Sequence, residues 1–155
     1  MNIYADTNFF TSLYCTGPNH AEALRLDQTA EEHGCAGYPM TLLGRLEFVN
    51  ALQQSVYSTR NGIPGVHLTP EMALVIEAKF HEHLLRGDLL RQMSCDERRL
   101  ERQFKEISHR HTAKEGFRTY DILHVSSALV LGCDTFWSFD AKAKKLAKLE
   151  GLKVN

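Results

Sequence analysis

Residues 2–10 have the sequence NIYADTNFF, which joins a short apolar run, an acid and the start of a helix. The run Ile3–Ala5 has the length and composition of a buried strand. Asp6 follows it directly, and Thr7 and Asn8 are residue types suited to opening a helix. We therefore expect Asp6 at the carboxyl end of a strand, either as a helix cap or as part of a site.

The same arrangement recurs near the other end of the chain. Residues 135–139 predict a short strand, and residues 141–149, rich in Lys, Ala and Leu, predict the helix after it. Asp140 lies between them, as a second acid at the end of a strand that can also cap a helix. Because side chains alternate along a strand, Ser138 is expected to face the same way as Asp140.

A third acid, Glu47, lies in a helix predicted over residues 41–52. Thr41 is the expected cap of this helix, and the expected core stripe is Leu42, Leu46 and Val49. Taken alone, a Glu in this position is more often a solvated helix residue.

The fourth acid, Asp121, opens the most hydrophobic helix of the chain, predicted over residues 120–131. His124 and Ser127 are among the few polar residues that accompany it inside that helix. Asp121 can cap the helix or pair with Arg118, since a buried charge is usually paired.

The four acids gain meaning as a set. Acids at strand ends, together with acids on helices that follow other strands, can converge in the crevice where open α/β sheets bind ligands. Grouped carboxylates repel one another, so they take up protons or recruit a cation. Oxygen ligands select hard ions, which points to Mg²⁺ with Mn²⁺ as a substitute, whereas zinc would require His or Cys at metal-binding spacing.

The rest of the chain alternates between strand and helix signals, as an α/β fold requires. Strands are expected over residues 35–40, 89–93 and 152–154, and loops over residues 55–67 and 109–116. Capping boxes at residues 19/22 and 94/97 predict two helices, the first ending near Gly34. A third is predicted from Thr69 to Gly87, with a core stripe of Met72, Val75, Ile76, Phe80 and Leu84.

Composition predicts one domain in a reducing compartment. A chain of 155 residues with 43% hydrophobic content can build one sizeable core. The four cysteines are scattered, the N-terminus has no basic-then-apolar leader, and no apolar run reaches the ~18 residues that span a bilayer, so a cytoplasmic location without membrane contact is expected.

Charge is distributed unevenly along the chain. Residues 98–155 hold twelve Lys or Arg against seven Asp or Glu, while residues 1–97 hold six against twelve. The basic C-terminal part could guide a phosphate backbone toward the acids, although a Lys-rich helix such as residues 142–148 is explained equally well as a solvated face. The aromatic side chains, Tyr120 and Trp137 among them, are expected in the core.

Four segments together carry a resemblance to a known family: NIYADTNFF (2–10), RLEFVNAL (45–52), FRTYDILHVSSALVLGCDTFWSFD (117–140) and KLAKLEGLKV (145–154). In this order they resemble a PIN domain, and within that superfamily they are most similar to the VapC toxins of bacterial toxin–antitoxin pairs. The resemblance covers nearly the whole chain. It implies a single PIN-like domain over residues 1–155, a three-layer α/β/α sandwich with a central, mostly parallel sheet.

The resemblance also implies a function, that of a Mg²⁺-dependent ribonuclease. Its catalytic and metal-binding acidic quartet maps onto Asp6, Glu47, Asp121 and Asp140, with Asp6 and Asp121 as the usual direct ligands. Asn8, Arg118 and Ser138 are the expected substrate-binding residues. The chain departs from the family at Ser138, where Thr is common, and in the long stretch between Asn50 and Arg118.

The implied partners are an RNA substrate, a second copy of the chain, and a cognate antitoxin that lays a helix or an extended tail into a groove beside the active site. Two alternatives stay open. Another Mg²⁺-dependent phosphate-transfer hydrolase, such as a haloacid-dehalogenase-type phosphatase, also begins from an acid after the first strand, but it needs a second Asp where this chain has Asn8. A catalytically silent PIN-like module for RNA binding or partner docking would not need four acids.

Overall fold

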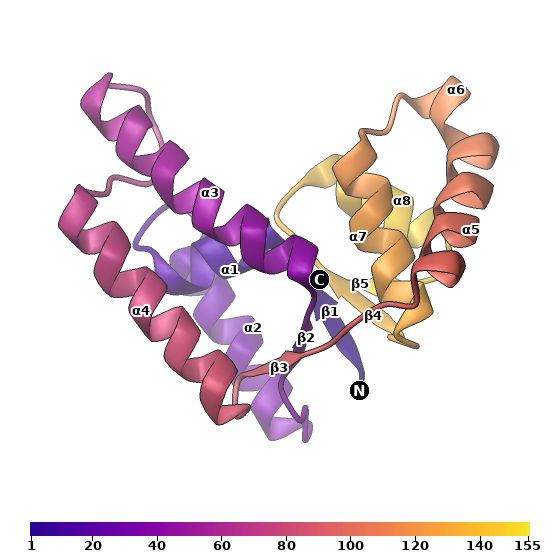
Figure 1. Ribbon diagram of the computed structural model, residues 1–155, viewed down its shortest axis with the longest axis horizontal. Coiled ribbons are helices and arrows are strands. Elements are labelled where there is room, and N and C mark those ends of the chain that lie inside the picture. The colour runs from indigo at the N-terminus through magenta and orange to yellow at the C-terminus, as the bar shows by residue number, and fades with distance from the viewer.

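The computed structural model describes residues 1–155, in which short parallel strands run through the middle of the molecule (Figure 1). Strands β1 (Ile3–Ala5), β4 (Thr135–Trp137) and β5 (Lys153–Val154) pair in the order β1-β4-β5. Strand β2 (Tyr38–Met40) pairs with β3 (Leu90–Gln92) and lies beside β1. Every pairing is parallel, which confirms the predicted α/β class. Each predicted strand is present, most of them shortened by one to three residues.

Helices lie on both sides of the strands (Figure 1). One group comprises α1 (Thr7–Tyr14), α2 (His20–Glu32), α3 (Leu42–Arg60) and α4 (Pro70–Arg86). The other comprises α5 (Glu97–Ile107), the π-helical turn η1 (Ser108–Thr112), α6 (Ala113–Glu115), α7 (Thr119–Val130) and α8 (Ala141–Leu149). None of these helices has the length and apolar content needed to cross a membrane.

Strand β1 separates the two halves of the hydrophobic core. Ile3 and Ala5 pack into the half formed with α1 to α4, whereas Tyr4 packs into the half formed with α5, α7 and α8. In β4, Trp137 packs into the half formed with α1 to α4, and Phe136 packs into the half formed with α5, α7 and α8. Because neighbouring side chains of a strand point to opposite faces, both faces of the sheet are buried under helices. This is the layered α/β/α arrangement that the resemblance implies.

Several helix boundaries follow the predicted capping chemistry. The Thr41 side chain accepts a hydrogen bond from the Gly44 N–H at 3.3 Å, and the Thr69 side chain accepts one from the Met72 N–H at 3.2 Å. Gly87 ends α4 with φ +69°, the left-handed conformation that glycine adopts without strain. The capping boxes were predicted wrongly. Asn19 makes no side-chain cap bond, and α5 is capped by Asp96 in place of Ser94.

Helix α3 is longer than predicted, and the face that it turns toward the core is not the predicted one. It continues to Arg60, so residues 55–60 are helical where a loop was expected. Its predicted core stripe is wrong, because Leu42 and Leu46 are 60% and 62% exposed. The buried stripe starts at Gly44 and recurs every four residues (Gly44, Phe48, Leu52 and Val56). This orientation of α3 is set by Phe48, because its ring stacks on Phe80 of α4 with centroids 4.1 Å apart.

Helix α4 shows the same kind of error. Of its predicted core stripe, Met72 and Val75 are exposed, whereas Phe80 is buried and Ile76 and Leu84 pack against the core as predicted. Apolar side chains on the outer surfaces of α3 and α4 therefore face solvent.

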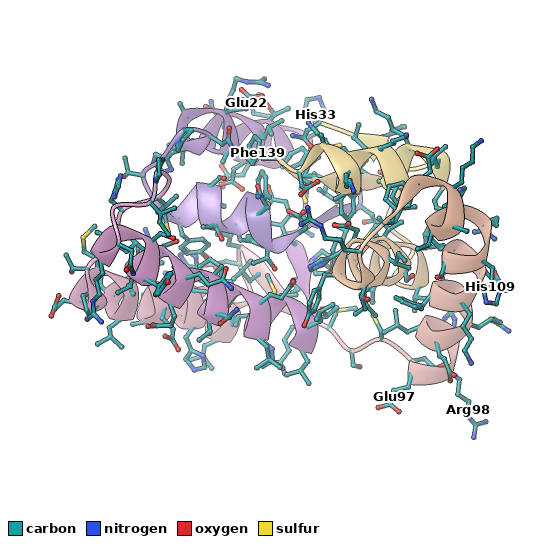
Figure 2. The ribbon with its side chains drawn as sticks, turned by 90° about the horizontal axis from the view of Figure 1, so that it is seen from above. Glu22, His33, Glu97, Arg98, His109 and Phe139 are labelled. Atoms are coloured by element: carbon teal, nitrogen blue, oxygen red, sulfur yellow. The ribbon has the colours of Figure 1, made fainter.

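Residues 109–115 are helical where a polar connection was predicted, since they form part of η1 and all of α6. Glu150 holds this polar segment in place: its carboxylate accepts from Arg110 Nη2 at 2.6 Å and contacts His111 Nε2 at 2.7 Å. Figure 2 shows Arg98 and His109 pointing outward from the adjoining α5–η1 segment, away from the core.

Candidate active site

Asp6 lies where β1 ends and α1 begins, as predicted. Its Oδ1 accepts a hydrogen bond from the Phe9 N–H at 3.0 Å, so it caps α1. The Asp6 N–H donates to the Trp137 carbonyl of β4 at 3.1 Å, which fixes the residue at the edge of the sheet. The carboxylate is 6% exposed. Burial raises the pKa of Asp6, and the nearby Asp140 adds to this increase, whereas His124 and Ser138 oppose it.

Asp140 occupies the matching position after β4. Its Oδ1 accepts from the backbone N–H groups of Lys142 and Ala143, at 2.7 and 3.2 Å, and so caps α8. The fully buried Ser138 accepts from the Asp140 N–H at 2.8 Å. The two strand-end acids are thus helix caps, and each holds its carboxylate at the carboxyl end of a parallel strand.

Asp121 lies in the first turn of α7 and is almost fully buried. Its Oδ2 accepts from the Arg118 backbone N–H at 3.0 Å. The Arg118 guanidinium forms no ion pair within the protein, so its charge is available to a ligand. The alternative prediction, an ion pair between Arg118 and Asp121, is therefore wrong.

Glu47 is held by a chain of hydrogen bonds. Thr7 Oγ1 donates to Glu47 Oε2 at 2.8 Å, and His124 Nε2 contacts the same oxygen. On its other side, His124 Nδ1 meets the Tyr4 hydroxyl at 2.9 Å. Burial raises the pKa of Tyr4, so the phenol keeps its proton and can donate it to Nδ1, which leaves the Nε2 proton facing Glu47. Burial also acts to raise the pKa of Glu47, but His124 and Thr7 outweigh it and lower that pKa.

All four acids line one cleft of about 580 Å³. Most of its lining residues come from α1, α3 and the N-terminal parts of α7 and α8. Figure 1 shows α3 and α7 on opposite sides of the strands. Asn8, Arg118 and His124 also line it. Segments that are far apart in the sequence therefore meet at the carboxyl ends of β1 and β4, where open α/β sheets place their ligands.

The oxygen-only donor set fits a hard divalent ion such as Mg²⁺. No three His, Cys, Asp or Glu side chains lie close enough together to form a complete ion site. Each acid instead has a local partner: a helix-end N–H for the three aspartates and His124 with Thr7 for Glu47.

The three expected substrate-binding residues differ in their accessibility. Arg118 is exposed, and both it and Asn8 line the cleft. Ser138 does not line it, since it is buried behind the acids and bonded to the Asp140 N–H.

Sequence reasoning missed part of this cleft. Tyr120, expected in the core, is 55% exposed and lines the cleft beside Asp121. The cleft also continues along one face of α3 beyond Glu47, past Ala51, Gln54, Ser55 and Ser58. The sequence does contain a pattern that predicts this face, because each of these residues follows the previous one by one, three or four positions, the spacing of residues on one helix face.

Comparisons with known proteins place the fold. Neither a family model nor a curated protein matches the sequence. The structure is similar to the crystal structure of Mycobacterium tuberculosis VapC20, which is described as a sarcin–ricin loop cleaving toxin. The TM-score is 0.63, the match covers 92% of this chain and 93% of that chain, and the sequence identity is 17%. At this identity the likeness shows the fold alone: the chain has the α/β fold of VapC20, in agreement with the fold that the resemblance implies.

Proposed function

We propose that this protein is a Mg²⁺-dependent ribonuclease that hydrolyses phosphodiester bonds in RNA, and that it is the toxin of a toxin–antitoxin pair. The observation that carries the proposal is the meeting of Asp6, Glu47, Asp121 and Asp140 in one cleft. Four carboxylates with a single cation beside them are unsuited to binding a polyanion unless a metal ion neutralises them. The VapC-type fold supports the same reading.

The position of each residue in or behind the cleft suggests its role in the proposed reaction. The four carboxylates would hold the ion, Asp6 and Asp121 directly. Bound Mg²⁺ would supply positive charge to the phosphodiester and lower the pKa of the attacking water. Arg118 would contact a phosphate oxygen and Asn8 would orient the phosphate or the water, since both side chains reach the cleft. Buried Ser138 would act on the carboxylates, while His124 and Thr7 would keep Glu47 ionised and oriented.

The test is cleavage of a mixed cellular RNA pool by the purified protein. Three reactions are compared: the wild type with Mg²⁺, the wild type with EDTA, and the Asp6→Asn variant with Mg²⁺. The fragment ends are mapped by sequencing. Cuts that require Mg²⁺ and are absent from the variant support the proposal. Because the fold neighbour is described as cleaving the sarcin–ricin loop, ribosomal RNA belongs in the pool. Equal cutting by the Asp6→Asn variant would refute the assignment of the acids.

The same experiment separates the alternatives. A silent RNA-binding module would bind RNA with no Mg²⁺-dependent cuts. A phosphatase would release inorganic phosphate from small phosphomonoesters without producing internal cuts in RNA.

A protein partner is part of the proposal. Leu42 and Leu46 on α3, with Leu74 and Val75 on α4, are 60–69% exposed. Exposed apolar side chains that gather on neighbouring helices mark interaction surfaces. A homodimer, a cognate antitoxin and a cytoplasmic location are the expectations that go with the toxin assignment. Light scattering of the purified protein, alone and co-expressed with the product of an adjacent reading frame, tests both partners.

A further inference from the structure

The cleft has two chemically different ends. One end holds the four acids and Arg118. The other runs along the polar face of α3 toward its C-terminal end, where Figure 1 shows α3 projecting away from the strands. We call this second end the neutral arm, and it is lined by Thr11, Ser12, Asn19, Gln54, Ser55 and Ser58.

The neutral arm has defined walls. Thr11 and Ser12 belong to α1, Asn19 precedes α2, and the other three residues belong to α3. At the far end, the loops that contain Gly17 and Val66 pack so closely that a Cβ on Gly17 would lie 2.9 Å from Val66 Cγ2. A space bounded by helices and by two loops in contact is a shaped pocket, and the whole cleft falls within the ~300–1,000 Å³ typical of ligand sites.

The neutral arm contains no charged side chain, so it is not built for phosphate. The lining cation of the cleft, Arg118, belongs to the acidic end. Phosphate oxygens are hydrogen-bond acceptors that favour Arg, Lys or clustered N–H donors. A sugar–phosphate backbone would therefore gain little from entering the arm.

The free hydrogen-bond donors and acceptors of the neutral arm match those of a nucleobase. The hydroxyls of Thr11, Ser12 and Ser55 donate to backbone carbonyls one turn earlier, at 2.9, 3.0 and 3.0 Å. Their oxygens therefore remain as acceptors toward the cleft. The Asn19 and Gln54 amides make no hydrogen bond within the protein and offer both donors and acceptors. Base edges likewise present N–H donors beside carbonyl and ring-nitrogen acceptors.

The neutral arm is continuous with the acids. Gln54 lies seven residues after Glu47, two turns along the same helix face and about 10 Å away along the axis. Between them stands Ala51, whose methyl group leaves the passage open. A base attached near a phosphate at the acids can therefore enter the arm.

From this geometry we propose that the neutral arm binds one unpaired nucleobase next to the scissile phosphate and thereby selects the cut site. This inference rests on the proposed ribonuclease function. Sequence-specific recognition of RNA usually works on unpaired bases in loops, whose edges are free to form hydrogen bonds. Gln54 and Asn19, from opposite walls of the arm, are the proposed specificity-determining residues.

The test uses two adjacent glutamines. Gln54 lines the arm, whereas Gln53 is also exposed on the same helix but lies outside the cleft. The wild type, Gln54→Ala and Gln53→Ala digest an RNA library with randomised unpaired positions in Mg²⁺, and the cut sites are sequenced. We expect a base preference at one position relative to the cut, reduced roughly three- to ten-fold by Gln54→Ala, the range of one hydrogen bond. Gln53→Ala should keep the wild-type preference.

A second variant guards against an indirect effect. Asn19 makes no cap bond, so Asn19→Ala should leave α2 intact while altering the preference at the same nucleotide position as Gln54→Ala. If the wild type cuts RNA but shows no base preference, or if Gln54→Ala and Gln53→Ala give the same profile, the inference is overturned. If the folded, Mg²⁺-loaded wild type cuts no RNA at all, the proposed function itself fails.

Discussion

Replacing Asp6 with Asn should stabilise the metal-free protein at neutral pH while sharply reducing its stabilisation by Mg²⁺. Burial and the neighbouring Asp140 raise the pKa of Asp6, so its ionised form is destabilised in the folded state. Asn removes the charge but retains the cap, because its side-chain oxygen can accept from the Phe9 N–H as Asp6 does at 3.0 Å. The stabilisation therefore comes from the charge alone.

Ala at the same position separates the cap from the charge. Asp6→Ala also removes the charge, but it loses the cap, which costs about 1 kcal/mol (range ~0.5–2). For a chain of this size, 1 kcal/mol changes Tm by about 2–4 °C. The Asp6→Ala variant should therefore melt about 2–4 °C below Asp6→Asn.

The pH dependence has a definite sign. A carboxyl with a raised folded-state pKa binds more protons when folded than when unfolded, so stability falls as pH rises from the ordinary Asp range through the raised value. The stability advantage of Asp6→Asn over the wild type should therefore grow with pH across that window and then level off.

Thermal melts followed by circular dichroism, in EDTA across a pH series and again with Mg²⁺, measure all of these effects. At a Mg²⁺ concentration 100 times its Kd the wild type should gain about 2.7 kcal/mol, or about 5–11 °C, and both variants should gain much less. The reasoning is refuted if Asp6→Asn melts below the wild type in EDTA at neutral pH, or if Mg²⁺ stabilises Asp6→Asn as much as it stabilises the wild type.

Three further predictions concern packing and RNA contacts. Phe48→Ala removes a fully buried ring and should cost about 3–5 kcal/mol, seen as a large drop in the denaturant midpoint. Gly37→Ala should cost about 1–3 kcal/mol in the same assay, because Gly37 has φ +87° and an added Cβ would lie 2.8 and 2.9 Å from two backbone carbonyl oxygens. Tyr120→Ala should weaken binding of unpaired RNA by about 1–3 kcal/mol in fluorescence anisotropy, the range of one stacked base. Tyr57→Ala, which removes an exposed tyrosine outside the cleft, should leave that affinity unchanged.

Local sequence rules were sufficient to locate the acids. An apolar run followed by Asp and a helix start has few conformations, so Asp6 and Asp140 could be placed at strand ends before any tertiary contact was known. In a parallel sheet, carboxyl ends of neighbouring strands lie at one edge, and β1 pairs directly with β4. The meeting of these two acids therefore follows from the strand pairing.

Tertiary contacts decided what the sequence left open. Helix α3 contains apolar residues on two faces, Leu42 and Leu46 on one and Phe48 and Leu52 on the other, so periodicity alone does not choose between them. The segment 109–115 is polar and lacks a hydrophobic stripe, and its helical form depends on Glu150, about forty residues later. Neither outcome is encoded in neighbouring residues.

The wrong core stripe and the missed neutral arm are one error. Leu46 and Ser55 are nine residues apart, which at about 100° per residue places them on opposite sides of α3. If Leu46 faced the core, Ser55 would point straight into solvent and no arm could form. Stacking of Phe48 on Phe80 instead turns Leu46 outward and brings Ser55 to the wall of the cleft. One aromatic contact between α3 and α4 thus sets the rotation that places a polar helix face beside the acids, which is why Phe48→Ala should alter cut-site preference as well as stability.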